Sequence, residues 1–334
     1  MNLITKKIIP IICILLFLLT SCAGKGFIVD INEAPSDDQC IVFGKLTLIG
    51  AEGVEKWGEK FFEKPLLIIL PPNSNIAHSY EIKDDGNFFW SLSPGEYTIL
   101  GFGNFMSVSQ KLPIRAKFNV PIGKKSLYIG NFLLIMQSNR FGCTIEDNSE
   151  ISISKFKNKF HNIREEPSIS IMETEPQPGS YDNIQYICDD KWGIKCENKY
   201  LGKIFNGVIP IYPEATAQPF KKISNAKSIF KWEASVNKNV TYDLIVYEAA
   251  AYYIDSIGKT YIPGRVVLLN EDIKDPSYQL TTELKPGTNY YWSVRLREGN
   301  DVSTWSLFHY FYFYVVGASS ASNQWFTFST PPNI

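Results

Sequence analysis

His78 and Glu81 are the side chains in this sequence whose types and spacing come closest to those of a catalytic metal site. A catalytic zinc needs a third protein ligand and a general base around the same ion. The other two histidines, His161 and His309, lie far along the chain. Two residues three apart on a strand also point to opposite faces of the sheet. The sequence therefore predicts no metal site.

No other group of residues has the spacing of a catalytic centre. A G-x-S-x-G nucleophile elbow is absent, and Gly101-Phe102-Gly103 lacks the rest of a dinucleotide-binding fingerprint. Acidic neighbours such as Asp189 and Asp190 are more typical of solvated surface charge than of a calcium site. We therefore predict that the protein is not an enzyme and carries no cofactor.

An alternating aromatic run near the C-terminus is the strongest candidate for binding. In a strand, Tyr310, Tyr312 and Tyr314 share one face, whereas His309 lies on the other with two phenylalanines. Tyrosines supply large rigid area with a polar tip, which suits recognition of a sugar or a protein. The alternative is a long final strand whose phenylalanine face joins the core and whose tyrosine face is half exposed.

The N-terminal residues have the layout of a secretory signal peptide. Lys6 and Lys7 precede an apolar run that ends at Leu19, and small residues and Cys22 follow it. The run is shorter than the roughly 20 residues of a transmembrane helix. We expect residues 1–21 to be removed on export, which changes the formal net charge from -1 to about -3.

Leu19-Thr20-Ser21-Cys22 resembles the bacterial lipobox, in which the signal is cut before the cysteine and that cysteine carries lipid chains. The resemblance implies that Cys22 is the mature first residue and bears palmitate or similar acyl chains. Two or more such chains hold a protein on a bilayer stably. Ala23 follows, where an aspartate would resemble the inner-membrane retention signal of many Gram-negative bacteria. An outer-membrane location is therefore favoured if the host is Gram-negative.

Four further cysteines would lie in an oxidising compartment, where three disulfide connectivities are open to them. Cys188 and Cys196 bracket a turn-prone loop that a disulfide could close. Pairing of Cys40 with Cys143 would then tie the start of the first domain to its end. The chain has no C-x-x-C and no nearby pair of histidines, which argues against zinc at these cysteines.

Composition and aromatic patterning predict an all-β protein with two β-sandwich domains and a short mixed connector that carries one helix. A chain of 334 residues is long enough for two domains. Its aromatic residues fall mostly in short alternating runs, which favours strands. The near-neutral charge gives no indication of nucleic-acid binding. We divide the chain into a signal peptide, a tether and three structural segments, at 1–21, 22–39, 40–143, 144–204 and 205–334.

The first domain, residues 40–143, opens with a β-rich run from Cys40 to Ile49. Residues 65–70 form a continuous apolar run, as expected of a strand that is buried on both faces. Asp84-Asp85-Gly86-Asn87 between two aromatic-rich runs predicts a β-hairpin. Two further strands are expected at 116–120 and 126–136.

The stretch Asp85-Gly86-Asn87-Phe88-Phe89-Trp90-Ser91-Leu92-Ser93-Pro94-Gly95-Glu96-Tyr97 resembles the D-G-x-F-x-x-x-L-x-P-G-x-Y pattern of transthyretin-like, or carboxypeptidase-regulatory-like, β-sandwiches. The resemblance covers roughly residues 40–138 and implies a sandwich of that type. Modules of this family usually support or bind and rarely catalyse, so the resemblance implies no activity.

The connector, residues 144–204, is expected to contain the helix. Apolar residues recur at helical spacing from Ile153 to Ile163, and Asp147-Asn148-Ser149-Glu150 in front of them predicts a capping box with a carboxylate at the N-cap. We expect the apolar stripe to pack on a sandwich; an amphipathic helix on the membrane is the alternative. Residues 165–179 are rich in Glu and Pro and form either a linker or a segment that lies over the surface.

The second domain, residues 205–334, contains alternating strands around Trp232 and after Pro286-Gly287. Tyr290 follows that turn in the arrangement of a tyrosine corner. With Trp305-Ser306 and the closing aromatic strand, the segment resembles a fibronectin type III, or immunoglobulin-like, sandwich over about residues 207–332. It departs from that family in the long insertion 307–323, which contains the alternating tyrosines.

Together these features predict a lipid-anchored protein of the bacterial envelope that binds or scaffolds a protein or a glycan without catalysis. One alternative is a zinc-dependent or other hydrolase, because His78 and Glu81 resemble the H-x-x-E fragment of zinc carboxypeptidases. A second alternative is a purely structural lipoprotein that spaces other envelope components.

Overall fold

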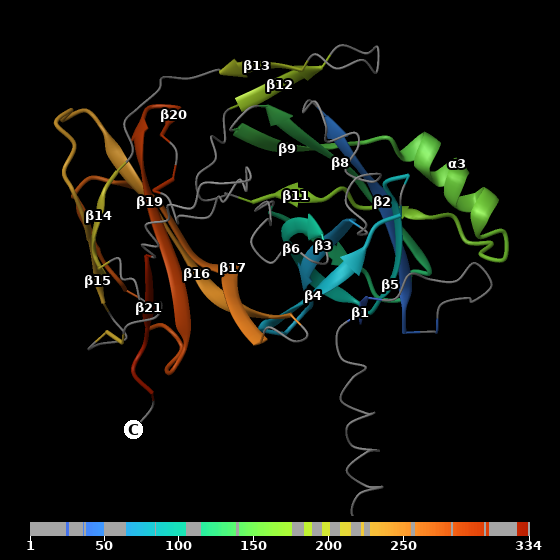
Figure 1. Cartoon of the computed structure of the whole chain (residues 1–334), viewed down its shortest axis with the longest axis horizontal. Helices are drawn as coiled ribbons and strands as arrows, with labels where there is room; N and C mark the ends of the chain where they lie inside the picture. Colours follow the sequence, from blue (N-terminus) through green and yellow to red (C-terminus); the bar gives the residue numbers. More distant parts are fainter. Residues whose placement is uncertain are drawn as a thin grey trace, which may run out of the picture.

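The structure is a computed structural model, which describes residues 25–26, 36, 38–49, 65–83, 85–104, 115–137, 140–175, 184–188, 196–200, 208–214, 222–223, 228–254, 258–281, 283–303, 305–306 and 326–332. This part of the chain is mostly β and contains one helix, as the sequence predicts. Its strands form two sandwiches that lie side by side (Figure 1).

The first sandwich consists of two sheets that enclose an apolar core. One sheet has the order β11-β7-β6-β3-β4, and the other has the order β10-β8-β2-β5 with β9 also paired to β8. Phe88 and Trp90 stack at the centre of the core with their ring centroids 4.1 Å apart. The strands are β1 (Lys25–Gly26), β2 (Cys40–Ile49), β3 (Pro65–Leu70), β4 (Ile76–Glu81), β5 (Asn87–Leu92), β6 (Gly95–Asn104), β7 (Ala116–Val120), β8 (Ser126–Gln137), β9 (Arg140–Glu146), β10 (Ser168–Ile169) and β11 (Glu173–Thr174).

The turn at residues 83–87 forms with the chemistry that the sequence predicts, but the predicted hairpin is wrong. Gly86 has φ +79° and donates its N–H to the carbonyl of Lys83, and Asp85 accepts the backbone N–H of Asn87. However, β4 before the turn pairs with β3, whereas β5 after it pairs with β2 in the opposite sheet. The turn therefore carries the chain from one layer of the sandwich to the other.

Helix α3 (Ser149–Lys159) covers the outer face of the β2-containing sheet (Figure 1). Phe156 is buried and stacks on Phe43 of β2, with ring centroids 4.3 Å apart. The predicted capping box does not form, because Asn148 occupies the N-cap and makes no side-chain cap bond. Asp147 instead accepts the backbone N–H of Ser149 in a local turn.

The segment that follows the helix lies over the first sandwich and does not act as a free linker in its described part. β10 pairs with β8, and β11 pairs with β7. Met172 between them is buried in the core of the sandwich. Of the two alternatives for residues 165–179, the structure of residues 165–175 matches the surface segment.

The second sandwich packs a three-stranded sheet, β14-β15-β18, against β17, β16, β19 and β21. Trp232, Phe230 and Trp292 lie in its core, as expected for the large residues of a sandwich. The strands are β14 (Pro210–Tyr212), β15 (Ile229–Trp232), β16 (Thr241–Ile254), β17 (Gly258–Ile273), β18 (Ser277–Gln279), β19 (Asn289–Glu298), β20 (Asp301–Val302) and β21 (Thr327–Ser329); β12 (Ile184–Cys188) and β13 (Cys196–Tyr200) form a separate pair.

Both sandwiches contain a tyrosine whose hydroxyl donates back to the turn before it. Tyr290 donates to the carbonyl of Lys285 at 3.4 Å, and Tyr97 donates to the carbonyl of Ser93 at 3.0 Å. Both rings are buried. The predicted tyrosine corner at Tyr290 is therefore confirmed, and the first sandwich uses the same local arrangement.

A long hairpin, β16 with β17, connects the two sandwiches. Its proximal part belongs to the second core, and its distal part packs on the outer face of β3. Ala251 and Tyr252 of β16 pair in parallel with Ile76 and Ala77 of β4, so one sheet continues through both sandwiches. The apolar run of β3 is consequently buried on both faces, as the sequence predicts.

Within the described residues, the only helix falls short of the length and apolar character that a membrane span requires.

We predict that Phe156→Ala lowers the free energy of unfolding by about 3 to 5 kcal/mol, because it opens a cavity between α3 and the sheet. Urea denaturation of the purified chain measures the change. Ile151→Ala is the control on the same helix, since Ile151 is 62% exposed and its truncation should cost no more than about 0.5 kcal/mol. Equal losses in both variants would contradict the packing of α3.

Candidate functional site

The predicted anchor and the predicted aromatic binding face lie outside the residues that the structure describes. The anchor is Cys22, and the binding candidates are Tyr310, Tyr312, Tyr314 and His309. All five remain predictions from the sequence.

His78 and Glu81 both lie on β4. Their positions on the strand differ by three, so they face opposite sides of the sheet. Partial burial lowers the pKa of His78. Among the described residues, no group of three His, Cys, Asp or Glu side chains is placed to hold a metal ion.

Cys40 is a buried free thiol, so the predicted disulfide to Cys143 is wrong. Burial raises the pKa of the Cys40 thiol to about 12. The strand register gives the physical reason. Cys143 pairs with Leu134, which pairs with Leu48, eight residues along β2 from Cys40. Eight residues of strand span roughly 26 Å, whereas a disulfide needs Cα atoms within about 7 Å.

Cys188 and Cys196 stand directly opposite each other in the antiparallel pair β12–β13. Directly opposed residues in such a pair have Cα atoms about 4.5 to 5.5 Å apart, which is within the range of a disulfide. The register therefore fits the predicted Cys188–Cys196 bond, and the bond itself remains a prediction.

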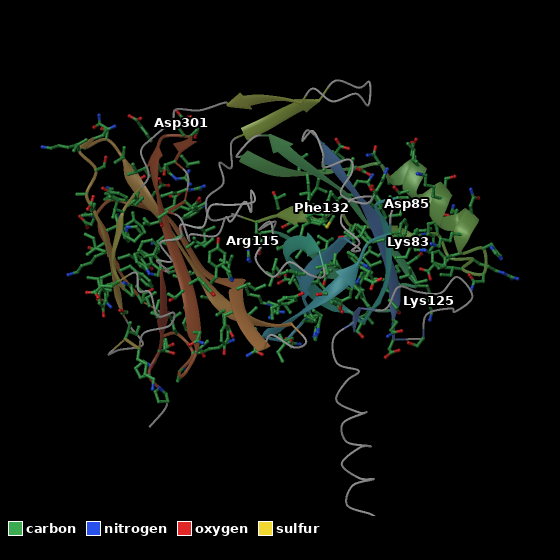
Figure 2. The ribbon with its side chains drawn as sticks, in the orientation of Figure 1. Lys83, Asp85, Arg115, Lys125, Phe132 and Asp301 are labelled. Carbon is green, nitrogen blue, oxygen red and sulfur yellow. The ribbon has the colours of Figure 1, made fainter. Side chains whose placement is uncertain are left out.

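Arg115 is the central polar side chain at the junction of the two sandwiches (Figure 2). It is 2% exposed and donates to the backbone carbonyls of Pro263 and Gly264 in β17, at 3.0 and 2.6 Å. It also forms a 2.9 Å salt bridge with Glu175 and lies over the ring of Tyr247 at 4.7 Å. One side chain of the first sandwich thus binds the backbone and an aromatic ring of the second.

Further polar contacts hold the same junction. Arg265 of β17 donates to the carbonyls of Ser74 and Pro71, in the turn before β4. Ser79 and Tyr252 share a 2.6 Å hydrogen bond between their hydroxyl groups. Because these contacts lie beside paired strands and an apolar cluster, we interpret the junction as a permanent structural joint.

The apolar cluster at the junction explains why the joint is stable. Side chains of β3, β4 and β6 meet side chains of the hairpin there, and they are Leu66, Ile68, Leu70, Ala77, Leu100, Ala250 and Tyr252, with Ile262 partly buried. Full burial of one large aliphatic side chain contributes about 1.5 to 3 kcal/mol. Several such side chains outweigh the cost of desolvating Arg115 next to them.

A charged cluster on the second sandwich joins side chains of β16, β17 and β19. Asp243 is fully buried and accepts from Arg295 Nε at 2.7 Å and from both Nε and an Nη of Arg297. Glu271 lies 2.5 Å from Arg297, and Arg295 lies over the ring of Trp305 at 4.4 Å. Because the Asp243 carboxylate accepts hydrogen bonds from two guanidinium groups, we interpret this cluster as one that stabilises the sheet.

Two lysine amines meet beside α3, and sequence reasoning missed them. Lys83 follows β4, Lys159 ends α3, and their Nζ atoms lie 6.0 and 3.9 Å from the centroid of the Phe89 ring. Burial, and then hydrogen-bond contact with Lys83 and its charge, lower the pKa of Lys159 to about 8. Asp85 is the carboxylate nearby, and its hydrogen bonds with Asn87 hold the pKa of Asp85 below its usual value despite partial burial. No sequence pattern brings these residues together.

Comparisons with known proteins give no family for the chain: no family model and no curated protein matches it. Among solved structures it is similar to a DUF3823 family protein from Parabacteroides merdae ATCC 43184, with 10% identity, 82% of this chain and 100% of that chain covered, and a TM-score of 0.19. A DUF3823 family protein from Bacteroides ovatus ATCC 8483 is also similar, with 9% identity and a TM-score of 0.16; the match covers 80% of this chain and 96% of that chain. The chicken CNTN1 FN1–FN3 domains are similar with 9% identity and a TM-score of 0.17; the match covers 79% of this chain and 65% of that chain. TM-scores this low carry no argument about fold or function.

We predict that the Cys40 thiol reacts with a maleimide only after unfolding, and does so without reductant. The folded protein should protect it because it is buried with a pKa of about 12. Peptide mass spectrometry after labelling in the presence and absence of urea measures this, with Cys40→Ala as the control for assignment. A Cys40 peptide that resists labelling in urea until a reductant is added would contradict the free thiol.

We also predict that Arg115→Met lowers the free energy of unfolding by about 3 to 5 kcal/mol, because it leaves Glu175 and two carbonyls without their buried partner. Urea denaturation measures the loss. Lys117→Met is the matched control, since it removes an exposed salt bridge to Glu173 that contributes no more than about 1 kcal/mol. Similar losses in the two variants would show that the junction does not depend on Arg115.

Proposed function

We propose that this protein is a lipid-anchored protein of the bacterial envelope that binds or scaffolds a protein or a glycan without catalysis. The observation that carries the proposal is the junction, where Arg115, Arg265 and the pairing of β4 with β16 join the two sandwiches. Binding surfaces on the two sandwiches would therefore be held at a fixed spacing. A fixed spacing suits a scaffold, because no entropy of domain motion is lost when a partner contacts both.

The position of β1 supports a lipid anchor at Cys22 that lies close to the first sandwich. Lys25 and Gly26 of β1 pair with Ser79 and Tyr80 of β4. Lys25 is only three positions after Cys22, the proposed lipid-bearing residue. Three residues span at most about 10 Å. If Cys22 carries acyl chains, the edge of β4 lies next to the membrane surface. In a Gram-negative host, Ala23 favours the outer membrane for this arrangement.

The aromatic run that contains Tyr310, Tyr312 and Tyr314 is the proposed contact surface for a glycan or protein partner. It follows Trp305-Ser306, which lie against β19: Ser306 accepts the backbone N–H of Val294 at 3.0 Å. The chain is therefore held on the second sandwich at Ser306, four residues before Tyr310 in the sequence. Tyrosine faces suit both classes of partner, so the test below includes both.

We predict that the wild-type chain recovers a partner, either in a cross-linking pull-down from cells or on a carbohydrate array. Cys22→Ser should leave that binding intact while it removes acyl label and membrane association, because the sandwiches do not depend on the lipid. Replacing Tyr310, Tyr312 and Tyr314 together by Ser should abolish binding but keep the far-ultraviolet circular dichroism spectrum.

A clean negative from both the pull-down and the array would contradict the binding role. Loss of envelope integrity on deletion, without any recovered ligand, would instead favour the structural lipoprotein. Acyl label that persists in Cys22→Ser would contradict the anchor.

A further inference from the structure

The amines of Lys83 and Lys159 form an unusual pair of like charges. Lys83 comes from the turn between β4 and β5, and Lys159 from the last turn of α3, so their meeting depends on the tertiary fold. Both lie over the ring of Phe89, which is buried beneath them. The ring face attracts cations, and Lys159 Nζ lies closer to its centroid, at 3.9 Å, than Lys83 Nζ does, at 6.0 Å.

Other lysines on the same sandwich have carboxylate partners. Lys117, Lys124 and Lys157 form salt bridges with Glu173, Glu165 and Glu166, at 3.1, 3.3 and 2.6 Å. No described carboxylate forms a salt bridge with Lys83 or Lys159. Two cations held over the same ring repel each other, and the fold maintains this unfavourable arrangement.

Among the described residues, the charged groups that act on Lys159 are Lys83 and Asp85. Asp85 accepts hydrogen bonds from the backbone N–H and the side-chain amide of Asn87, at 3.0 and 2.6 Å. These bonds keep the Asp85 carboxylate at the turn, where it reduces the repulsion without bridging the amines. An anion that bridged both amines would replace the repulsion by two charge-assisted hydrogen bonds.

We propose that Lys83 and Lys159 form a binding site for one oxyanion group, a carboxylate or a phosphate carried by an acidic ligand. Each ammonium offers three N–H donors, and both amines lie over the ring of Phe89. This inference extends the proposed function, because it names the chemical group on a glycan that the envelope protein would bind. It rests on the proposed function for the identity of that ligand. A phospholipid headgroup carries the same chemistry and is distinguished by the test.

The state of Lys159 gives the site a pH dependence. The charged amine binds the anion, so affinity should be full well below pH 8 and fall as the pH rises through the Lys159 pKa of about 8. Removing the charge of Lys83 should raise the pKa of Lys159, and the remaining affinity should then persist to higher pH. A merely structural role for Lys83 would not shift this profile.

The experiment measures binding to the purified full chain by isothermal titration calorimetry. Sulfate is the probe for the pH series, because its charge stays constant over that range, and glucuronate and inorganic phosphate are the probes for ligand type at pH 6.5. We expect saturable binding that weakens about tenfold in Lys83→Met and in Lys159→Met, the loss of one charge-assisted hydrogen bond. Lys155→Met, at an exposed position on α3, is the matched control and should bind as the wild type does.

Vesicles separate the two sources of the oxyanion. Tighter binding of glucuronate or phosphate than of phosphatidylglycerol vesicles supports a soluble acidic ligand. The site would instead be assigned to a lipid headgroup if the Cys22→Ser chain binds phosphatidylglycerol vesicles but not phosphatidylcholine vesicles, and if this binding depends on Lys159.

The proposal is overturned if no probe binds saturably at pH 6.5, or if Lys159→Met binds as the wild type does. These outcomes are distinct from failure of the proposed function. A protein that lacks a partner in pull-down and array can still bind sulfate at this site, and one that recovers a partner can fail to bind it.

Discussion

The pairing of the β16–β17 hairpin with the first sandwich is the constraint on which the rest of the structure depends. β3 has apolar side chains on both faces, and only one face can lie in the core of its own sandwich. Left uncovered, Leu66, Ile68 and Leu70 would expose a contiguous apolar patch to water. The hairpin covers that patch, and its parallel pairing to β4 also satisfies part of an otherwise open sheet edge. The second sandwich therefore completes the first.

The buried charge of Arg115 makes the register of the junction specific, whereas the apolar contact alone would allow the hairpin to pack at several positions. Arg115 costs free energy to desolvate, and it recovers that cost only when Glu175 and the carbonyls of Pro263 and Gly264 are all in place. A hairpin shifted by one residue along β4 would leave these groups unpaired. The apolar cluster thus supplies most of the stability, and Arg115 fixes the register at which the sandwiches meet.

The features predicted correctly from the sequence are those set by nearby residues. The tyrosine corner at Tyr290 needs only a turn and a tyrosine a few residues later, and the two-faced burial of β3 follows from a continuous apolar run. Pairing between distant strands is different. The turn at Gly86 has the residues of a hairpin, yet β4 and β5 find partners in opposite sheets because Trp90 and Leu92 belong to the core between those sheets. The same limit applies to Lys83 and Lys159, which are 76 positions apart in the numbering.

The layers of the first sandwich also restrict where it can bind a ligand. α3 covers the outer face of one sheet with Phe156 and Phe160, and the hairpin covers part of the outer face of the other. Turns, strand edges and the ends of α3 are among the parts left to contact a ligand. Figure 2 places Lys83 and Asp85 on the side near α3 and Arg115 on the side near the second sandwich. The amine pair therefore lies away from the junction, so an anion could bind there without disturbing the contact that holds the two sandwiches together.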